Sequence, residues 1–265
     1  MTELHAWLPQ VIAIARQAGD AIMEVYGGDI KVQRKLDRTP LTEADLAAHR
    51  VIEQGLRAMT PQIAVLSEES AVVPYAVRRG WQRYWLVDPL DGTREFIKRN
   101  GEFTVNIALI EQGKPVLGVV FAPDQNLLYY ACRGNGAYKA IDDNLTMPIH
   151  ARSLDLHRIT VAGSRSHADE RLQGFLRNLS APELISLGSS LKICLVAEGK
   201  ADVYPRLGPT SEWDTAAAQC VLEQAEGRLV DREGATLEYN SKESLLNPEF
   251  FACGATSHNW NQYLE

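Results

Sequence analysis

Near the start of the chain, apolar residues recur every three or four positions, which is the spacing of one face of an α-helix. The positions are Leu4, Trp7, Leu8, Val11, Ala15, Ala18, Ile22 and Val25. This pattern predicts a helix over residues 4–25 that ends at Gly27. A second helix is expected from Thr42 to about residue 59, because Thr42 and Asp45 have the spacing of a capping box.

Short apolar runs between turn residues follow the second helix, and they predict buried strands. These runs cover residues 63–66, 84–87, 104–110, 116–121 and 127–132. After them, the expected order is strand 158–162, helix 169–179, strand 184–187, helix 190–198, strand 202–207 and helix 213–225. Strands that alternate with helices indicate an α/β layer. We therefore expect an α+β N-terminal half, residues 1–155, with two helices on a mostly antiparallel sheet, and an α/β C-terminal half, residues 156–265.

Composition narrows the function classes. The 265 residues carry a formal net charge of −7, which argues against non-specific binding to nucleic-acid polymers. No apolar stretch approaches the roughly 18 residues of a membrane span, and Glu3 and Asp20 do not fit a signal peptide, so a cytoplasmic protein is expected. The scattered cysteines form no CxxC pair, so neither a zinc site nor a disulfide framework is expected.

Acidic residues stand where several predicted strands end. Glu68 follows one apolar run, Asp88 and Asp91 follow the next, and Asp214 lies at the start of the last predicted helix. Carboxylates at strand ends are held on a rigid scaffold and can converge on one point. Oxygen ligands suit hard cations such as Mg²⁺, and two such ions about 3.5–4 Å apart can clamp a phosphoryl group. Taken singly, each acid could instead belong to a turn, a solvated loop or a helix cap.

Two stretches carry a family resemblance. Asp88-Pro-Leu-Asp-Gly-Thr93, followed by Phe96, resembles the first signature of the inositol monophosphatase superfamily, and Trp213-Asp214-Thr-Ala-Ala217 resembles the second. The resemblance implies the layered αβαβα sugar-phosphatase fold and two or three Mg²⁺ ions. It implies metal ligation by Glu68, Asp88, Asp91, Asp214 and the Leu90 carbonyl.

The same resemblance implies roles in catalysis and substrate binding. Asp45 and Thr93 would orient and deprotonate a metal-activated water that attacks phosphorus directly, while the N–H groups of Gly92 and Thr93 hold the scissile phosphate. The implied substrate-binding residues are Glu68, Leu90, Asp91, Gly92, Thr93, His167, Ser189, Lys192, Arg206 and Asp214. Inhibition by lithium is also implied.

Further stretches are similar to the bacterial 3′(2′),5′-bisphosphate nucleotidases. They are residues 93–109, Ser164-Arg-Ser-His167, Gly188-Ser-Ser-Leu-Lys192 and Tyr204-Pro-Arg206. The implied substrate is adenosine 3′,5′-bisphosphate, a by-product of sulfate assimilation, cleaved to AMP and phosphate. His167, Ser189, Lys192 and Arg206 would bind the second phosphate and the nucleoside, unless Lys192 is a surface lysine and His167 merely caps or packs.

Alternatives remain at this point. An inositol or sugar monophosphatase of the same fold would need no pocket for a second phosphate. A non-catalytic regulator that binds a phosphorylated ligand is a second alternative, which the loss of a metal carboxylate would favour. Phosphoryl transfer from a nucleoside triphosphate is disfavoured because no GxxxxGK[ST] loop is present. The resemblance also allows a homodimer and peripheral association with the inner membrane.

Overall fold

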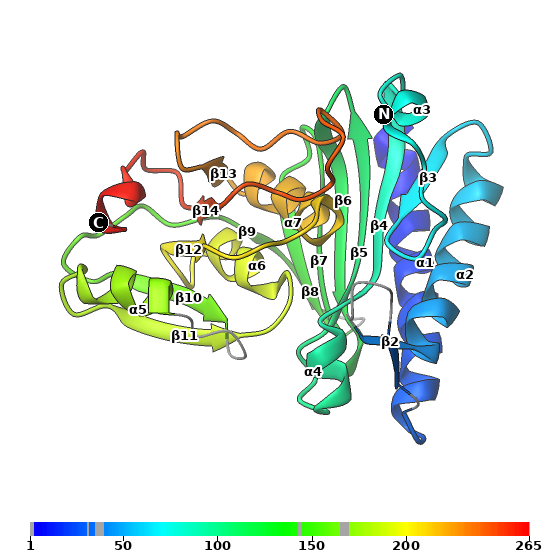
Figure 1. Cartoon of the computed structure of the whole chain (residues 1–265), viewed down its shortest axis with the longest axis horizontal. Helices are drawn as coiled ribbons and strands as arrows, with labels where there is room; N and C mark the ends of the chain where they lie inside the picture. The colour runs from blue at the N-terminus through cyan, green and yellow to red at the C-terminus, as the bar shows by residue number, and fades with distance from the viewer. Residues whose placement is uncertain (1–2, 31, 35–39, 143–144, 165–169, 265) are drawn as a thin grey trace.

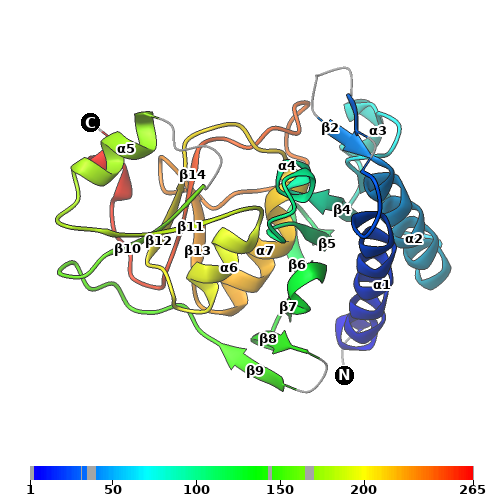
Figure 2. The same ribbon diagram turned by 90° about the horizontal axis from the view of Figure 1, so that it is seen from below.

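Helices and sheets alternate in layers in the computed structural model, which describes residues 3–30, 32–34, 40–142, 145–164 and 170–264. Figure 1 shows α1 (Glu3–Tyr26) and α2 (Glu43–Met59) on one face of a seven-stranded sheet. Figure 2 shows α6 (Leu191–Ala197) and α7 (Glu212–Gln224) between that sheet and a second one. A five-stranded sheet follows, with α5 (Glu170–Arg177) on its far side. This arrangement confirms the predicted αβαβα fold.

The seven-stranded sheet has the order β3-β4-β5-β6-β7-β8-β9. Its strands are β3 (Ala64–Ser67), β4 (Arg83–Asp91), β5 (Thr104–Glu111), β6 (Lys114–Ala122), β7 (Leu127–Cys132), β8 (Ala137–Ile141) and β9 (Leu145–Ile149). β3 pairs with β4 in parallel and all the other pairs are antiparallel. The expectation of a mostly antiparallel sheet is therefore confirmed.

The five-stranded sheet has the order β11-β10-β12-β14-β13 and is mixed. Its strands are β10 (Thr160–Ser164), β11 (Glu183–Leu187), β12 (Val203–Arg206), β13 (Arg228–Asp231) and β14 (Phe250–Cys253). β10 runs parallel to β11 and β12, and β14 runs antiparallel to β12 and β13. The last strand of the first sheet ends at Ile149 and β10 begins at Thr160, while the division into halves at residue 155 stays a prediction.

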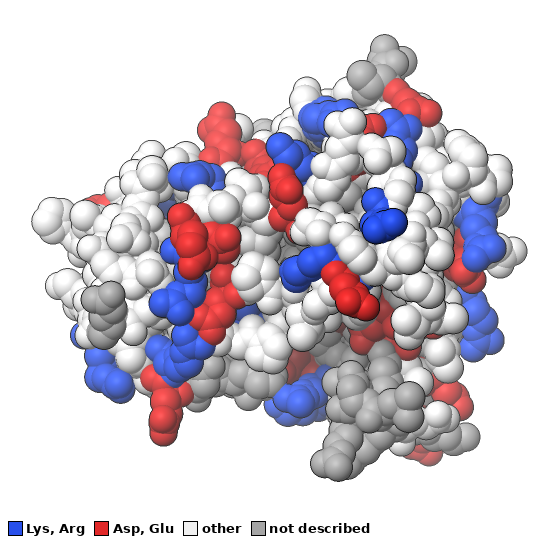
Figure 3. Space-filling model, turned by 45° about the horizontal axis from the view of Figure 1, so that its top comes forward, with Lys and Arg blue, Asp and Glu red and all other residues white. Residues whose placement is uncertain are grey.

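Smaller elements connect the layers. They are β1 (Val32–Arg34), β2 (Pro40–Thr42), α3 (Tyr75–Arg78), α4 (Thr93–Ile97), η1 (Pro123–Gln125) and η2 (Trp260–Tyr263). No helix in the described part of the chain is both long and apolar enough to cross a membrane. On the face shown in Figure 3, the positive and negative side chains of the described residues are interspersed.

The two N-terminal helices form for the reasons that their sequence suggests. α1 buries most of the predicted stripe, including Leu8, Val11 and Ile22, while Trp7 and Val25 are partly buried. α2 begins with the predicted capping box, in which Asp45 Oδ2 accepts the Thr42 N–H at 2.7 Å. Burying these apolar side chains supplies most of the stabilisation, because the hydrophobic effect scales with the area removed from water.

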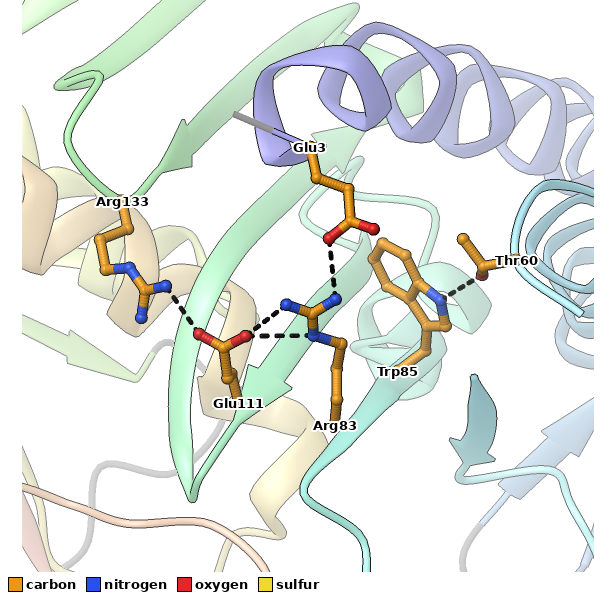
Figure 4. A network of polar contacts seen from close by, with 6 residues as sticks. All are labelled: Glu3, Thr60, Arg83, Trp85, Glu111 and Arg133. Atoms are coloured by element: carbon orange, nitrogen blue, oxygen red, sulfur yellow. Dashed lines mark hydrogen bonds and ion pairs between the residues drawn. The ribbon is translucent and has the colours of Figure 1, made fainter. Parts of the chain in front are cut away.

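Polar contacts fix the ends of these helices against the sheet (Figure 4). Arg83 on β4 contacts Glu3 of α1 at 2.9 Å and Glu111 on β5 at 2.5 Å. The indole N–H of buried Trp85 donates to Thr60 Oγ1 at 2.9 Å, where α2 ends. The partly exposed ion pairs contribute up to about 1 kcal/mol each, whereas losing a partner of the buried bond costs roughly 1–3 kcal/mol.

Helix α7 lies directly on the seven-stranded sheet at Gly118 of β6. A Cβ atom at this position would lie 2.7 Å from Cys220 Cβ and closer still to the Ala217 carbonyl oxygen. Both neighbours belong to α7, which cannot withdraw because α6 and the second sheet pack behind it. Glycine at residue 118 therefore sets the depth at which α7 sits.

Gly118→Ala should destabilise the fold by roughly 1–3 kcal/mol, because an added methyl group overpacks this contact. At about 2–4 °C per kcal/mol, we expect a fall in Tm of roughly 2–12 °C. Gly174→Ala is the matched control, since its Cβ would meet no described atom nearer than Arg177 Nη2, at 3.8 Å. Equal melting temperatures for the two variants would contradict this account of the contact.

Candidate metal and phosphate site

Three carboxylates from separate segments meet at one point. Glu68 follows β3, Asp88 lies in β4 and Asp214 lies in the first turn of α7. One oxygen of each lies within 4.8 Å of an oxygen of the others. The parallel pairing of β3 with β4 brings the first two together, and the Glu68 N–H donates to the Val87 carbonyl at 3.1 Å. The predicted convergence of these three acids is thus present in the structure.

Asp91 stands beside this trio, beyond an irregularity in β4. The register between β4 and β5 shifts between Asp88, which faces Asn106, and Asp91, which faces Thr104. The Asp88 Oδ1 accepts the Leu90 N–H at 3.0 Å. The Asp-Pro-Leu-Asp stretch is therefore the irregular last part of β4, and not a separate turn.

Gly92 follows at a position that requires glycine. Its φ is 90°, in the left-handed region that glycine adopts readily. A Cβ there would also lie 3.0 Å from the Glu102 carbonyl oxygen. The chain can therefore turn directly from Asp91 into α4, which brings Thr93 to the edge of the site.

Burial and repulsion dominate the electrostatics. Burial raises the pKa of Asp88 well above its usual range, and the negative charges of Glu68 and Asp91 raise it further. The pKa of Asp214 is raised well above its usual range by burial and by Asp91. The pKa of Asp91 is raised by burial, against the opposing effect of Lys192. A bound dication would offset this repulsion, and a donor set of oxygens alone fits Mg²⁺.

Thr93 and Asp45 form the next layer of the site. The Thr93 hydroxyl lies 3.4 Å from Asp45 Oδ1 and 3.5 Å from the Leu90 carbonyl oxygen. Asp45 Oδ2 is held at the same time by the N–H and the hydroxyl of Thr42, at 2.7 and 2.6 Å. Asp45 is therefore both a helix-capping residue and a partner of Thr93, so the two interpretations of this acid are compatible.

A cavity of about 630 Å³ is lined both by these carboxylates and by two cationic residues. Lys192 is only 4% exposed, so the interpretation as a surface lysine is wrong. Its Nζ donates to the Ser189 carbonyl at 2.6 Å and lies 5.3 Å from the centre of the Tyr204 ring. Burial lowers the pKa of Lys192 to about 8, although the charge of Asp91 opposes this effect. Arg206 also lines the cavity, and its Nη2 donates to the Pro209 carbonyl at 2.7 Å.

The N-terminus of α6 contacts a carboxylate of this chain. The Ser190 N–H donates to Asp91 Oδ2 at 2.6 Å. The amide is therefore used by a carboxylate of this chain. His167 lies outside the described residues. Sequence reasoning did not assign Ser190 or Tyr204 to the site, although both stand in the stretches that carry the resemblance.

Known proteins resemble this chain over most of its length. Residues 3–261 match the model of the inositol monophosphatase family. The chain belongs to this family.

Relatives within the family include named nucleotidases. The chain is 54% identical over 245 residues to the 3′(2′),5′-bisphosphate nucleotidase CysQ of Salmonella typhimurium, covering 92% of this chain and 98% of that protein. It is 53% identical to CysQ of Escherichia coli K12, with the same coverage. Among solved structures, CysQ from Bacteroides thetaiotaomicron is similar with a TM-score of 0.82 and 41% identity, covering 96% of this chain and 99% of that one.

Mg²⁺ should stabilise this family member, because a cation that binds only the folded state raises its stability. At about 100 times the dissociation constant the gain is roughly 2.7 kcal/mol, or about 5–11 °C in Tm. Asp214→Asn should reduce this Mg²⁺-dependent rise in Tm, while it keeps an oxygen to accept the Ser211 N–H. Thermal denaturation with and without Mg²⁺ measures the difference.

The control is Glu233→Gln, which removes an exposed carboxylate in the turn after β13. Its Mg²⁺ response should equal that of the unaltered protein. A full Mg²⁺ response in Asp214→Asn would remove Asp214 from the proposed metal site.

Proposed function

We propose that this protein hydrolyses the 3′-phosphate of adenosine 3′,5′-bisphosphate to AMP and phosphate, with Mg²⁺ as its cofactor. The observation that carries the proposal is one cavity lined both by the carboxylates and by buried Lys192 with Arg206. A substrate with two phosphates needs two recognition points, one for reaction and one for binding. The high identity to proteins named 3′(2′),5′-bisphosphate nucleotidase supports the same substrate.

The metal would be held by the cavity's carboxylates and one carbonyl: Glu68, Asp88, Asp91, Asp214 and the Leu90 carbonyl. Bound there, Mg²⁺ supplies positive charge that offsets the charge on the phosphoryl oxygens and lowers the pKa of water. How many ions bind stays a prediction.

Asp45 and Thr93 would handle the proton. Asp45 Oδ2 is held by Thr42, so its Oδ1 is fixed toward the Thr93 hydroxyl at 3.4 Å. Thr93 can pass its hydroxyl proton to Oδ1 while it accepts one from the attacking water. The amides of Gly92 and Thr93, which line the cavity, would hold the phosphoryl oxygens.

Lys192 and Arg206 would bind the second phosphate. Lys192 is held in place by the Ser189 carbonyl, and the Arg206 Nε is buried without a hydrogen-bond partner among the described residues. An anion placed between them would satisfy buried donors that otherwise cost free energy. A role for His167 in nucleoside binding stays a prediction, as do lithium sensitivity, a homodimer, a cytoplasmic location and peripheral membrane association.

Two alternatives make different demands on the site. An inositol or sugar monophosphatase needs no second anion site, so a buried lysine would have no purpose in it. A non-catalytic regulator needs no complete set of acids, whereas Glu68, Asp88, Asp91 and Asp214 all line the cavity. Both observations favour a bisphosphate hydrolase.

A phosphate-release assay tests the proposal directly. Adenosine 3′,5′-bisphosphate, its sulfated analogue, inositol 1-phosphate and fructose 1,6-bisphosphate should be compared with Mg²⁺ present. We expect the highest kcat/KM for adenosine 3′,5′-bisphosphate. A higher value for inositol 1-phosphate would overturn the substrate assignment, and no release from any of the four would favour the regulator.

Lys192→Met should lower kcat/KM for adenosine 3′,5′-bisphosphate by about one to two decades, since a charge-assisted hydrogen bond contributes roughly 1.5–3 kcal/mol. The loss with inositol 1-phosphate should be smaller. Lys192 has a pKa of about 8 and is charged below that pH. The kcat/KM of the unaltered enzyme should therefore fall as the pH rises through about 8, and Lys192→Met should lack this decline.

Lys114→Met provides the matched control, because Lys114 is exposed at the start of β6. It should keep both the kcat/KM and the alkaline decline. An unchanged pH profile in Lys192→Met would show that another group causes the decline.

A further inference from the structure

Three polar side chains with no role in the proposed reaction are buried next to the site. Thr104 and Asn106 lie on β5, and Ser190 comes immediately before α6. Their exposed fractions are 0%, 1% and 3%. A buried polar group costs free energy unless it is hydrogen-bonded, so each of the three needs a bonding partner.

The three side chains bond to one another in a closed ring. The Ser190 hydroxyl lies 2.8 Å from Asn106 Oδ1 and 2.9 Å from Thr104 Oγ1, and Asn106 Nδ2 donates to Thr104 Oγ1 at 3.3 Å. With Thr104 donating to Ser190, each member donates once and accepts once within the ring. Within such a ring each side chain has a hydrogen-bond donor and an acceptor as partners, which holds it in one orientation.

The ring fixes a backbone that needs support. Ser189 has a φ of 50°, in the left-handed region that side chains with a Cβ disfavour. Just before it, Gly188 donates to Glu102 Oε2 at 2.8 Å, and a Cβ at Gly188 would lie 2.7 Å from the Glu102 carbonyl oxygen. The segment 188–190 is thus held at both ends, by Glu102 at one and by the Ser190 hydroxyl at the other.

Asp91 depends on this segment. Asp45, Asp88 and Asp214 each accept a backbone N–H from a residue two or three positions away. Asp91 instead accepts its backbone N–H from Ser190, which is 99 positions away in the sequence. The direction of the Asp91 carboxylate is therefore set by tertiary contacts, and Thr104 lies directly opposite Asp91 in the β4–β5 register.

We propose that Thr104, Asn106 and Ser190 are positioning residues that aim the Asp91 carboxylate into the metal site through the Ser190 amide. The inference rests on the proposed function, because it assigns Asp91 to metal binding. The ring connects β5 of the first sheet to the start of α6, so it also fixes where α6 begins relative to that sheet. Partners that orient metal ligands typically change metal affinity by about 10–100-fold when removed.

Isosteric variants of Thr104 test the proposal. Thr104→Val removes the hydroxyl but keeps the shape, whereas Thr104→Ser keeps the hydroxyl. The readout is the Mg²⁺ concentration that gives half of the rise in Tm, measured on metal-stripped protein without substrate. We expect Thr104→Val to raise this concentration about tenfold or more, and Thr104→Ser to stay within about twofold of the unaltered protein.

Thr60→Val is the control for a merely structural effect. Thr60 also has a buried hydroxyl with two hydrogen bonds, to Trp85 and to the Leu56 carbonyl, but it lies at the end of α2 (Figure 4). It should lower Tm and leave the Mg²⁺ half-saturation unchanged. If Thr104→Val behaves in the same way, the positioning role is overturned.

Two further outcomes are decisive. Should Thr104→Val fail to fold, Ser190→Ala replaces it under the same criterion, because that variant removes only the hydroxyl and keeps the amide. A Tm of the unaltered protein that does not respond to Mg²⁺ would overturn the inference. If Mg²⁺ raises Tm but adenosine 3′,5′-bisphosphate releases no phosphate, the proposed substrate fails while the positioning role is still decided by the half-saturation values.

Discussion

Buried negative charge at the meeting point of several segments is the constraint on which the rest of the structure depends. Carboxylates taken out of water lose solvation, and neighbours of like sign repel one another. Here burial and mutual repulsion raise the pKa values of Asp88, Asp91 and Asp214 together. Without other contacts, such carboxylates would be more stable facing water. The fold must therefore hold each carboxylate with contacts that offset this cost.

Backbone amides provide that hold. One oxygen of Asp45, Asp88, Asp91 and Asp214 accepts a backbone N–H at 2.6 to 3.0 Å. Fixing one oxygen of a planar carboxylate fixes the direction of the other, so a ligand finds the acids already oriented. Two of these bonds are also helix caps, which means that α2 and α7 form with their acids in place. The stability of ordinary local structure thus offsets the cost of an unfavourable charge cluster.

The difference between local and tertiary contacts explains which features could be predicted from the sequence. The α1 stripe, the capping box of α2, the acid after β3 and the acids in the last part of β4 depend on neighbours in sequence, and all were predicted. β8, β9 and β13 were missed because short strands with mixed burial leave no clear period. β14 is buried throughout, but it and α4 are too short to show a period. The burial of Lys192 and the ring around Ser190 depend on packing between distant segments. Such contacts leave no local pattern, although polar Thr104 and Asn106 in an apolar strand were a usable signal.

Asp91 couples the carboxylates of the cavity to Lys192 electrostatically. The negative charge of Glu68 raises its pKa, and the positive charge of Lys192 lowers it. In turn, the charge of Asp91 is the largest influence that keeps Lys192 protonated against burial, ahead of Glu95 and Glu102. A cation bound at the carboxylates therefore changes the pKa of Lys192 through Asp91, and an anion beside Lys192 changes the pKa of Asp91. A dication at the acids would offset the negative charge of Asp91 and so remove part of what keeps Lys192 protonated. An anion beside Lys192 would restore that compensation, so a substrate whose second phosphate reaches the lysine would return Lys192 to its charged form.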